Sequence, residues 1–272
     1  MNDILALVGD IRAWGANVKY AANVAAMLEC ALTGAYILPP CPPSYDFAPP
    51  SLASEIIEIC RGQFDVAVRA GKDFSAWAAG NDVPSNSWHI AEGSPIDVIA
   101  SAANWHDLAV LERGESFSWI EAGQALLAVD IPCLVVPEQF EEFRLDTIAV
   151  AWNGSAQSAR AVHSSLPLLR RASMVVLIDG SHIEPLAGTG VGAGPARNIE
   201  LYLAGHDIKV TRTRIDADAA HAGEQILDAA SDGAADLLVM GVYGRARFSE
   251  WIFGGATRHV LEHARLPLFM RH

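Results

Sequence analysis

The sequence predicts an α/β fold made of two repeats of a five-stranded parallel sheet with helices on both faces. Strand-length apolar runs alternate with segments whose apolar residues recur at helical spacing, which is typical of parallel α/β sheets. Three strand-like runs also occur twice, in the same order and about half a chain apart, which indicates an internal repeat. The matching runs are Asp107–Leu111 with Asp236–Met240, Ile131–Val136 with Leu266–Met270, and Ile4–Val8 with Ile148–Trp152.

Composition narrows the classes of protein to consider. The chain has 272 residues, of which 51% are hydrophobic, enough for two domains with sizeable cores. A net charge of -13 predicts no binding to nucleic acid or to anionic membrane surfaces. No apolar run reaches the ~20 residues of a membrane span, and the N-terminus lacks the basic region of a signal peptide. The four cysteines, without a CxxC pair, predict reduced thiols in a cytoplasmic protein: Cys30, Cys41, Cys60 and Cys133.

The first repeat is predicted to cover residues 1–140. After its second strand comes a proline-rich stretch, residues 39–50, which cannot be helical. A stiff surface loop is favoured there, and a ligand for a proline-binding domain is the alternative. The expected strands are Ile4–Val8, Ala35–Leu38, Trp88–Ala91 and Leu108–Leu111, and the expected helices are Val18–Leu32, one from Ser51 through Phe64, and Ile96–Ala103.

The second repeat is predicted to cover residues 141–272. A helix from Ser158 to Arg170 is expected to be interrupted near Pro167, because proline removes a helical hydrogen bond. Glycine occupies every second position of residues 188–194, which favours a mobile loop, with a lid over a ligand as the alternative. The other expected elements are the strands Thr147–Trp152, Met174–Ile178 and Val210–Ile215, and the helices Ala196–Ala204 and Gly223–Ala230.

A glycine motif follows the last long apolar strand of the second repeat. The strand ends at Gly241 and Gly244 follows; after nine intervening residues, Gly254 opens a segment with helical spacing. A glycine turn that leads into a helix N-terminus exposes unpaired N–H groups, which suit a phosphate. Thr257 adds a hydroxyl donor, and three arginines add positive charge nearby: Arg245, Arg247 and Arg258. No nucleophile or metal cluster accompanies the motif, so we expect it to hold a phosphate rather than attack one.

This G-x2-G-x9-G pattern, its helix and the closing strand Pro267–Met270 resemble the universal stress protein family, in which the pattern is the ATP-binding motif. With the internal repeat, the resemblance covers nearly the whole chain and identifies it as similar to the tandem type, with two such domains in one polypeptide. It implies a Rossmann-type fold. It also implies ATP or another adenine nucleotide as the ligand, and no metal beyond nucleotide-associated Mg²⁺.

The resemblance also implies which residues hold the nucleotide. The phosphates would contact Gly241, Gly244, Gly254, Gly255, Ala256 and Thr257, and the adenosine would contact Asn153, Met240 and the backbone near Ala151 and Leu177. Two positions depart from the family pattern: Asn153 stands where aspartate is usual, and Gly255 stands where serine or threonine is usual. Trp152 is a third departure, for which base stacking and core packing are both open, and core packing is favoured.

The first repeat lacks the motif. From Asp107 to Pro132 there are 25 positions, against 31 from Asp236 to Pro267 in the second repeat. The missing residues fall where the glycines would be, and Glu112 and Glu115 would repel a phosphate there. We therefore expect the first repeat to have lost nucleotide binding. The resemblance implies that it pairs with the second through their last strands, as an intramolecular pseudo-dimer.

The sequence thus favours a cytoplasmic stress-response protein that binds an adenine nucleotide in its second repeat. Catalysis is expected to be slow or absent, because no general base or Walker-type lysine is placed for hydrolysis. The alternative is a nucleotide-free pseudo-dimer that binds a protein partner of unknown identity, which Trp152, Asn153 and Gly255 favour. A hydrolase is a third hypothesis. Further dimerisation of the chain stays open.

His259 and His263 lie four residues apart in the last helix, the spacing of two metal ligands on one helical face. Because no HExxH motif is present, the sequence favours helix-surface positions over a metal site.

Overall fold

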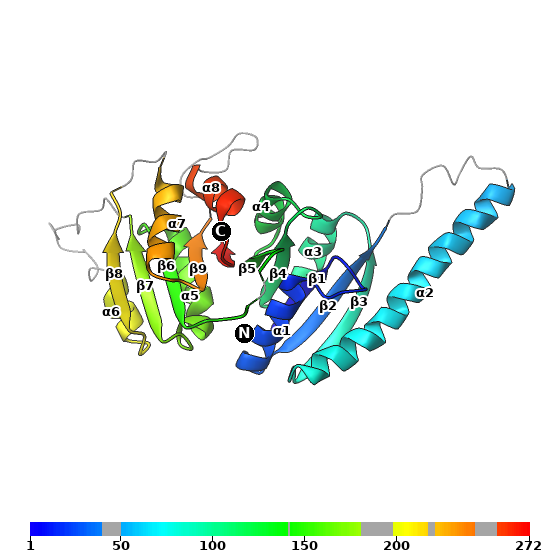
Figure 1. The fold of residues 1–272 in the computed structure, drawn as a ribbon, viewed down its shortest axis with the longest axis horizontal. Helices are drawn as coiled ribbons and strands as arrows, with labels where there is room; N and C mark the ends of the chain where they lie inside the picture. Colours follow the sequence, from blue (N-terminus) through cyan, green and yellow to red (C-terminus); the bar gives the residue numbers. More distant parts are fainter. Residues whose placement is uncertain (40–49, 141, 181–197, 217–220, 243–254) are drawn as a thin grey trace, which may run out of the picture. The chain divides into compact units, whose positions relative to one another are not determined.

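The computed structural model of the chain describes residues 1–39, 50–140, 142–180, 198–216, 221–242 and 255–272. Most of the proline-rich stretch, the glycine-rich stretch 188–194, Gly244 and Gly254 lie outside these residues, as do Arg245 and Arg247. The described residues form an α/β fold with mostly parallel strands, which confirms the predicted class (Figure 1). They divide into two compact units, Met1–Ile131 and Pro132–His272. Among these residues no helix combines the length and apolar character needed to cross a membrane.

Unit 1 contains four parallel strands in the order β3-β2-β1-β4. The order reverses beside β1, because the chain moves outward from β1 to β3 and then returns to β4 on the other side. The strands are β1 (Asp3–Val8), β2 (Ala31–Leu38), β3 (Ser85–Glu92) and β4 (Leu108–Arg113). The helices are α1 (Ala16–Leu28), α2 (Pro50–Gly80), α3 (Pro95–Ala103) and α4 (Trp119–Ala128).

Unit 2 contains six strands in the order β5-β10-β9-β6-β7-β8, all parallel except that β5 and β10 pair antiparallel. The strand β5, which the sequence assigns to the first repeat, therefore lies in unit 2. The strands are β5 (Cys133–Pro137), β6 (Thr147–Trp152), β7 (Met174–Asp179), β8 (Val210–Arg214), β9 (Leu237–Gly241) and β10 (Leu268–Arg271). The helices are α5 (Ala156–Leu169), α6 (Ile199–Ala204), α7 (Ala222–Asp232) and α8 (Gly255–His263).

Handedness decides which helices share a face of the unit 2 sheet. Crossovers between parallel strands are right-handed, so helices that lead in opposite directions along the sheet lie on opposite faces. The connections through α5 and α6 run from β6 toward β8, and those through α7 and α8 run back toward β10. We therefore assign α5 and α6 to one face and α7 and α8 to the other, where α7 and α8 pack against each other.

The repeat in the sequence corresponds to a repeated contact. Asp107, just before β4, accepts a hydrogen bond from the N–H of Asn2 at 2.5 Å. Asp236, just before β9, accepts one from the N–H of Thr147 at 2.9 Å. In both units the aspartate thus ties the start of the fourth strand of the repeat to the start of its first strand, which explains why both runs begin with this residue.

Some predicted boundaries are wrong. The helix predicted to reach Leu32 ends at Leu28, because Glu29 takes a left-handed conformation with φ 55° and β2 begins at Ala31. The predicted interruption at Pro167 is absent: α5 continues through it to Leu169. Pro167 has no backbone N–H to donate, yet the turn around it still closes, because the N–H of Arg170 donates to the carbonyl of Leu166 at 3.0 Å.

Two further features were not anticipated. The helix α2 has 31 residues and is held to the sheet by an aromatic cluster. In this cluster, the indole N–H of Trp88 on β3 donates to the carbonyl of Ala67 on α2 at 3.0 Å, and the rings of Phe74 and Trp88 lie 5.2 Å apart.

Four reduced cysteines were also expected, but Cys60 on α2 is disulfide-bonded.

The other two described cysteines are free and buried: Cys30 and Cys133. Burial raises the pKa of the Cys133 thiol to about 12, so it stays protonated at neutral pH.

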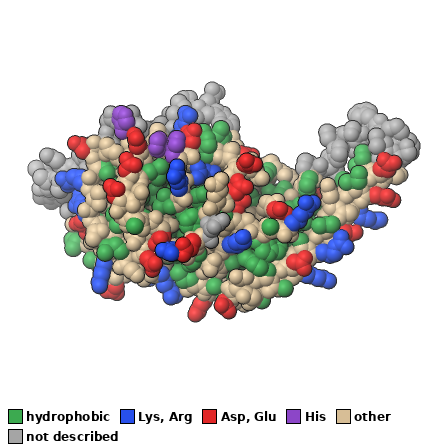
Figure 2. All heavy atoms as spheres, in the orientation of Figure 1, with side chains coloured by type: hydrophobic (Ala, Val, Ile, Leu, Met, Phe, Trp, Pro, Cys, Tyr) green, Lys and Arg blue, Asp and Glu red, His purple; other side chains and the backbone are tan. Residues whose placement is uncertain are grey.

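On the face shown in Figure 2, acidic and basic side chains are interspersed with apolar ones.

Candidate functional site

The topology of unit 2 defines a switch point between β6 and β9. These two strands are neighbours, with Ala151 opposite Met240, yet the chain leaves them in opposite directions along the sheet. In open α/β sheets such a reversal opens a crevice beyond the carboxyl ends of the strands, where ligands bind. The predicted adenosine residues Ala151 and Met240 therefore lie on the two strands that border this point, and Asn153 follows directly after β6.

A tight turn joins β6 to α5 at this edge. The Oδ1 atom of Asn153 accepts from the N–H of Ser155 at 3.1 Å, and Gly154 has φ +74°. Ser155 is the N-cap of α5, and its Oγ accepts from the N–H of Ser158 at 3.2 Å. Asn153 thus shapes the turn through an Asx-type hydrogen bond while its side chain stays exposed. Because α5 connects parallel strands, its N-terminus and the associated positive partial charge face the carboxyl edge.

Gly241, at the end of β9, lies directly against the start of α5. A Cβ atom at Gly241 would lie 2.4 Å from the carbonyl carbon of Gln157 and 2.4 Å from the nitrogen of Ser158. No side chain fits in that space without moving the helix. The sequence assigns this glycine to phosphate contact. The structure adds a separate reason for it, the close packing of strand and helix, and Gln157 and Ser158 were not among the predicted site residues.

The first turn of α8 carries the last predicted phosphate residues. Gly255 is exposed, Ala256 is half-buried, and Thr257 is buried with 5% of its surface exposed. Because β9 and β10 are parallel, α8 must run back along the sheet, so its N-terminus lies toward the carboxyl edge. Two helix N-termini, those of α5 and α8, thus point toward the same edge.

The apolar residues predicted for adenosine differ in how accessible they are. Leu177 on β7 is fully buried and Met240 is 5% exposed, so backbone atoms rather than side chains are available there. Ala151 and Trp152 are half-buried. The expectation that Trp152 packs in the core is therefore only partly met, because it keeps exposed surface at the end of β6.

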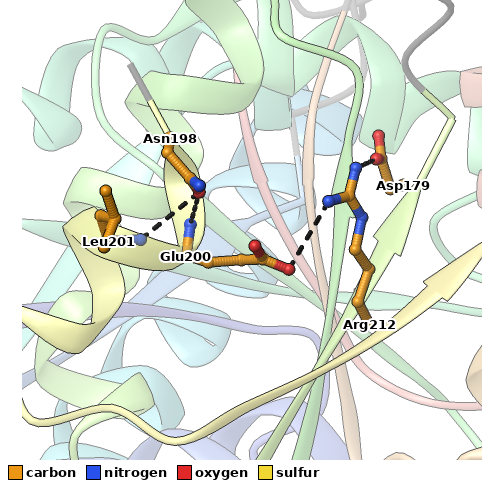
Figure 3. A network of polar contacts seen from close by, with 5 residues as sticks. All are labelled: Asp179, Asn198, Glu200, Leu201 and Arg212. Carbon is orange, nitrogen blue, oxygen red and sulfur yellow. Dashed lines mark hydrogen bonds and ion pairs between the residues drawn. The ribbon is translucent and has the colours of Figure 1, made fainter. Parts of the chain in front are cut away.

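A charged network that the sequence did not predict lies one strand further out (Figure 3). Asp179, the last residue of β7, has only 1% of its surface exposed and accepts a hydrogen bond from Arg212 on β8. Arg212 also lies 3.6 Å from the carboxylate of Glu200, in the first turn of α6. The hydrogen bond to Asp179 raises the pKa of Arg212, so the guanidinium stays charged. In the sequence, this network is indicated only by Asp179, an acidic residue at the end of the otherwise apolar strand β7.

Unit 1 has the same kind of switch point, between β1 and β4. Glu112 follows Asp107 by five positions, as Gly241 follows Asp236, so the two residues are equivalent in the repeat. The Oε2 atom of Glu112 accepts from the N–H of Asn17 at 3.4 Å, in the first turn of α1. A Cβ at Gly15 would lie 2.5 Å from that same oxygen. A carboxylate of the chain itself therefore occupies the helix N-terminus at this edge of unit 1.

Comparisons with known proteins agree with this architecture. The model of the universal stress protein family matches residues 144–271. Among curated proteins, universal stress protein Slr1230 of Synechocystis sp. is 25% identical over 191 residues, which span 65% of this chain and 61% of that protein. Less than two thirds of that relative's length is therefore matched.

Two solved structures are similar in fold. A universal stress protein from Archaeoglobus fulgidus has a TM-score of 0.64 at 13% identity, covering 99% of this chain and 96% of its own. A functionally unknown protein from Pseudomonas aeruginosa, PA1789, has a TM-score of 0.61 at 13% identity, covering 100% and 92%. At these identities the similarity concerns the fold alone.

Proposed function

This chain belongs to the universal stress protein family, and from that membership we propose that unit 2 binds one adenine nucleotide, ATP or a close analogue, in a stress-response role. The observation that carries the proposal is the switch point between β6 and β9. The sequence motif that begins at Gly241 starts at this point, and ligands of open α/β sheets bind there.

The phosphate end of the ligand would lie toward the N-terminus of α8. Backbone N–H groups of Gly255 and Ala256, with the hydroxyl of Thr257, supply donors of the kind that hold phosphate oxygens. Gly244 and Gly254 complete the motif in the sequence, and both lie outside the described residues.

The adenosine end would lie toward β6 and β7. Asn153 is exposed beside the turn and has amide donors and an acceptor to offer a ribose or base. Leu177 and Met240 are buried, so we assign them backbone contacts and apolar packing. Ala151 and Trp152 keep exposed surface that a base can cover.

Binding rather than turnover is proposed. The residues assigned to the site are glycines, apolar side chains, one amide and one hydroxyl. None of these side chains is a general base that would activate a water molecule for phosphoryl transfer. Any bound metal would be the Mg²⁺ that accompanies the nucleotide.

The first test looks for a nucleotide carried by the protein. We expect mass spectrometry of the small molecules released by denaturing the purified chain to find an adenine nucleotide, or the nucleotide-free chain to bind ATP in a calorimetric titration. Thr257→Val removes one hydroxyl donor at nearly the same size and should weaken ATP binding roughly 10- to 100-fold, the value of one hydrogen bond to a charged group. Gly244→Glu places a carboxylate among the phosphates and should abolish binding.

Matched controls exist for both substitutions. Thr211→Val removes a hydroxyl from an exposed position on β8, and Gly62→Glu adds a carboxylate at an exposed position on α2. Both controls should bind ATP like the wild type. If no nucleotide is released and the wild type does not bind ATP, the nucleotide proposal is wrong.

The second candidate function is a nucleotide-free interaction protein. The observation that favours it is a group of large apolar side chains exposed along α2: Ile57, Ile59, Phe64, Val66 and Val68. Exposed apolar side chains grouped on one element are typical of surfaces that meet a partner. Absence of nucleotide binding, together with an unaltered fold, would favour this candidate.

A further inference from the structure

The long helix α2 carries exposed apolar side chains on two of its sides. Ile57, Phe64 and Val68 follow one another at intervals of seven and four residues, so they form one line along the helix, which we call the outer stripe. Each of them has between 43 and 48% of its surface exposed. Ile59 and Val66 are also exposed, but they lie on roughly the opposite side of the helix, and we call them the inner stripe.

Contacts within unit 1 show that the outer stripe faces away from the rest of the unit. Trp77 is in line with the inner stripe and packs against Trp14, in the connection between β1 and α1, with ring centroids 5.6 Å apart. The inner stripe therefore lies on the side of α1. A Cβ at Gly71 would lie 2.5 Å from Cδ1 of Trp88, so this glycine marks the side that packs on β3, the outermost strand in the described part of unit 1. The outer stripe lies beyond it, and in Figure 1 the N-terminal half of α2 extends past the ends of the strands.

The charged side chains beside the outer stripe suit a second copy of the same helix. Glu58, Arg61, Asp65 and Arg69 are all exposed, and in the part of the chain that the structure describes none of them has an ion-pair partner. Two α2 helices that run in the same direction would bring each charge next to its own counterpart, and like charges repel. In opposite directions, with a two-fold axis beside Gln63, Arg61 of each copy lies opposite Asp65 of the other. Glu58 and Arg69, five residues before and six residues after Gln63, match in the same way.

We propose that the chain forms a symmetric dimer in which the outer stripes of two α2 helices pack antiparallel. Ile57 of each copy then covers Val68 of the other, and the two Phe64 rings meet beside the two-fold axis. Burial of the apolar stripe supplies the free energy of association, and the flanking charges fix the direction of the helices. Because two helices bury little surface for a protein interface, we expect a dissociation constant in the micromolar range. The pairing involves unit 1 alone, so it goes beyond the nucleotide site proposed for unit 2 and does not depend on it.

Sedimentation equilibrium of the full chain at a series of concentrations tests this proposal, and we expect a monomer–dimer equilibrium. Phe64→Glu should weaken the dimer on the order of a hundredfold, because it brings two carboxylates together beside the axis. Val66→Glu is the matched control: it places the same charge at a similarly exposed apolar position of α2, but on the inner stripe, and should dimerise like the wild type. A wild type that stays monomeric at every concentration overturns the proposal, as does a dimer that tolerates Phe64→Glu or is weakened equally by Val66→Glu.

A charge exchange tests the direction of the two helices. Glu58 and Arg69 lie eleven residues apart, about 16 Å along one helix, too far to attract each other within one chain. Glu58→Arg alone should weaken the dimer about fivefold, because arginine then faces arginine in both halves of the interface. Adding Arg69→Glu should restore the affinity to within about twofold of the wild type, since the opposite charges face each other again. If the double variant dimerises no better than Glu58→Arg, the helices do not pair antiparallel and the proposal fails.

Discussion

At the residue scale, Gly241 and Glu112 are equivalent positions with opposite consequences. Gly241 is the last residue of β9 and Glu112 the last but one of β4, the strands that border the switch points of the two units. Gly241 has no side chain, and the backbone of α5 fills the space where one would be. Glu112 instead extends a carboxylate to the first turn of α1. In unit 1 this position supplies a carboxylate to the helix N-terminus, and in unit 2 it supplies no side chain at all.

Gly241→Ala is expected to destabilise the chain. The added methyl group would lie 2.4 Å from backbone atoms of Gln157 and Ser158, so strand or helix must shift. Overpacking of this kind costs about 1–3 kcal/mol, which chemical denaturation monitored by circular dichroism would measure.

Gly62→Ala is the control for that substitution. Gly62 lies at an exposed position within α2, with nothing within 4 Å of an added Cβ. Alanine should stabilise the helix there by roughly 0.5–1 kcal/mol, because glycine has the greater freedom to lose on folding. If Gly241→Ala is as stable as the wild type, the strand and helix are not packed as described.

At the element scale, α4 shows how a local signal sets a helix boundary. Ser118 and Glu121 form a capping box: the N–H of Ser118 donates to Glu121 Oε2 at 2.7 Å, and the N–H of Glu121 donates to Ser118 Oγ at 3.3 Å. This pair can be read in the sequence as S-x-x-E before an apolar run. The helices expected for the first repeat nevertheless do not include α4, although its boundary signal is local.

Ser118→Ala should therefore shorten or fray α4. Loss of an N-cap costs about 0.5–2 kcal/mol, and denaturation curves would detect it. Ser118→Asp keeps a capping acceptor and should retain most of the stability, which makes it the matched control. Equal losses in the two variants would mean that the serine hydroxyl acts by packing rather than by capping.

At the scale of the whole molecule, two similar units differ at their switch points. Unit 1 carries Glu112 at its switch point, and its connection from Asp107 to Pro132 spans 25 positions. Unit 2 carries Gly241 there and has 31 positions for the equivalent connection from Asp236 to Pro267. If the nucleotide proposal holds, only unit 2 has room for a phosphate loop.

The stoichiometry should then be one adenine nucleotide per chain. Calorimetry on protein of known concentration measures this number directly. Glu112→Gly should leave it at one, because removing the carboxylate does not lengthen the connection. Two nucleotides bound per chain would contradict the assignment of unit 1 as inactive, while leaving the site in unit 2 intact.

Much of the architecture could be read from the chain itself. Alternating apolar runs identified the strands, because a parallel strand covered on both faces must be apolar along its length. The repeated Asp-apolar runs identified the two copies, since Asp107 and Asp236 make the same backbone contact. The motif from Gly241 to Thr257 identified the candidate site, because glycine spacing before a helix N-terminus is a local property.

Other features arise only from contacts between distant residues. The length of α2 was not predictable from its own periodicity, because the aromatic cluster that anchors it includes Trp88 from β3. The network of Asp179, Arg212 and Glu200 joins three separate elements, so no local pattern announces it.

The sequence by itself determined the α/β class, the repeat and the location of the candidate phosphate motif, because these depend on periodicity and on short-range spacing. Only the tertiary structure decided that Gly241 packs against α5, that Glu112 reaches α1, and that the rings of His259 and His263 stack. The physical reason is the range of the interactions. Backbone preferences act between neighbours in the chain, whereas close packing and ion pairing act between surfaces that folding brings together.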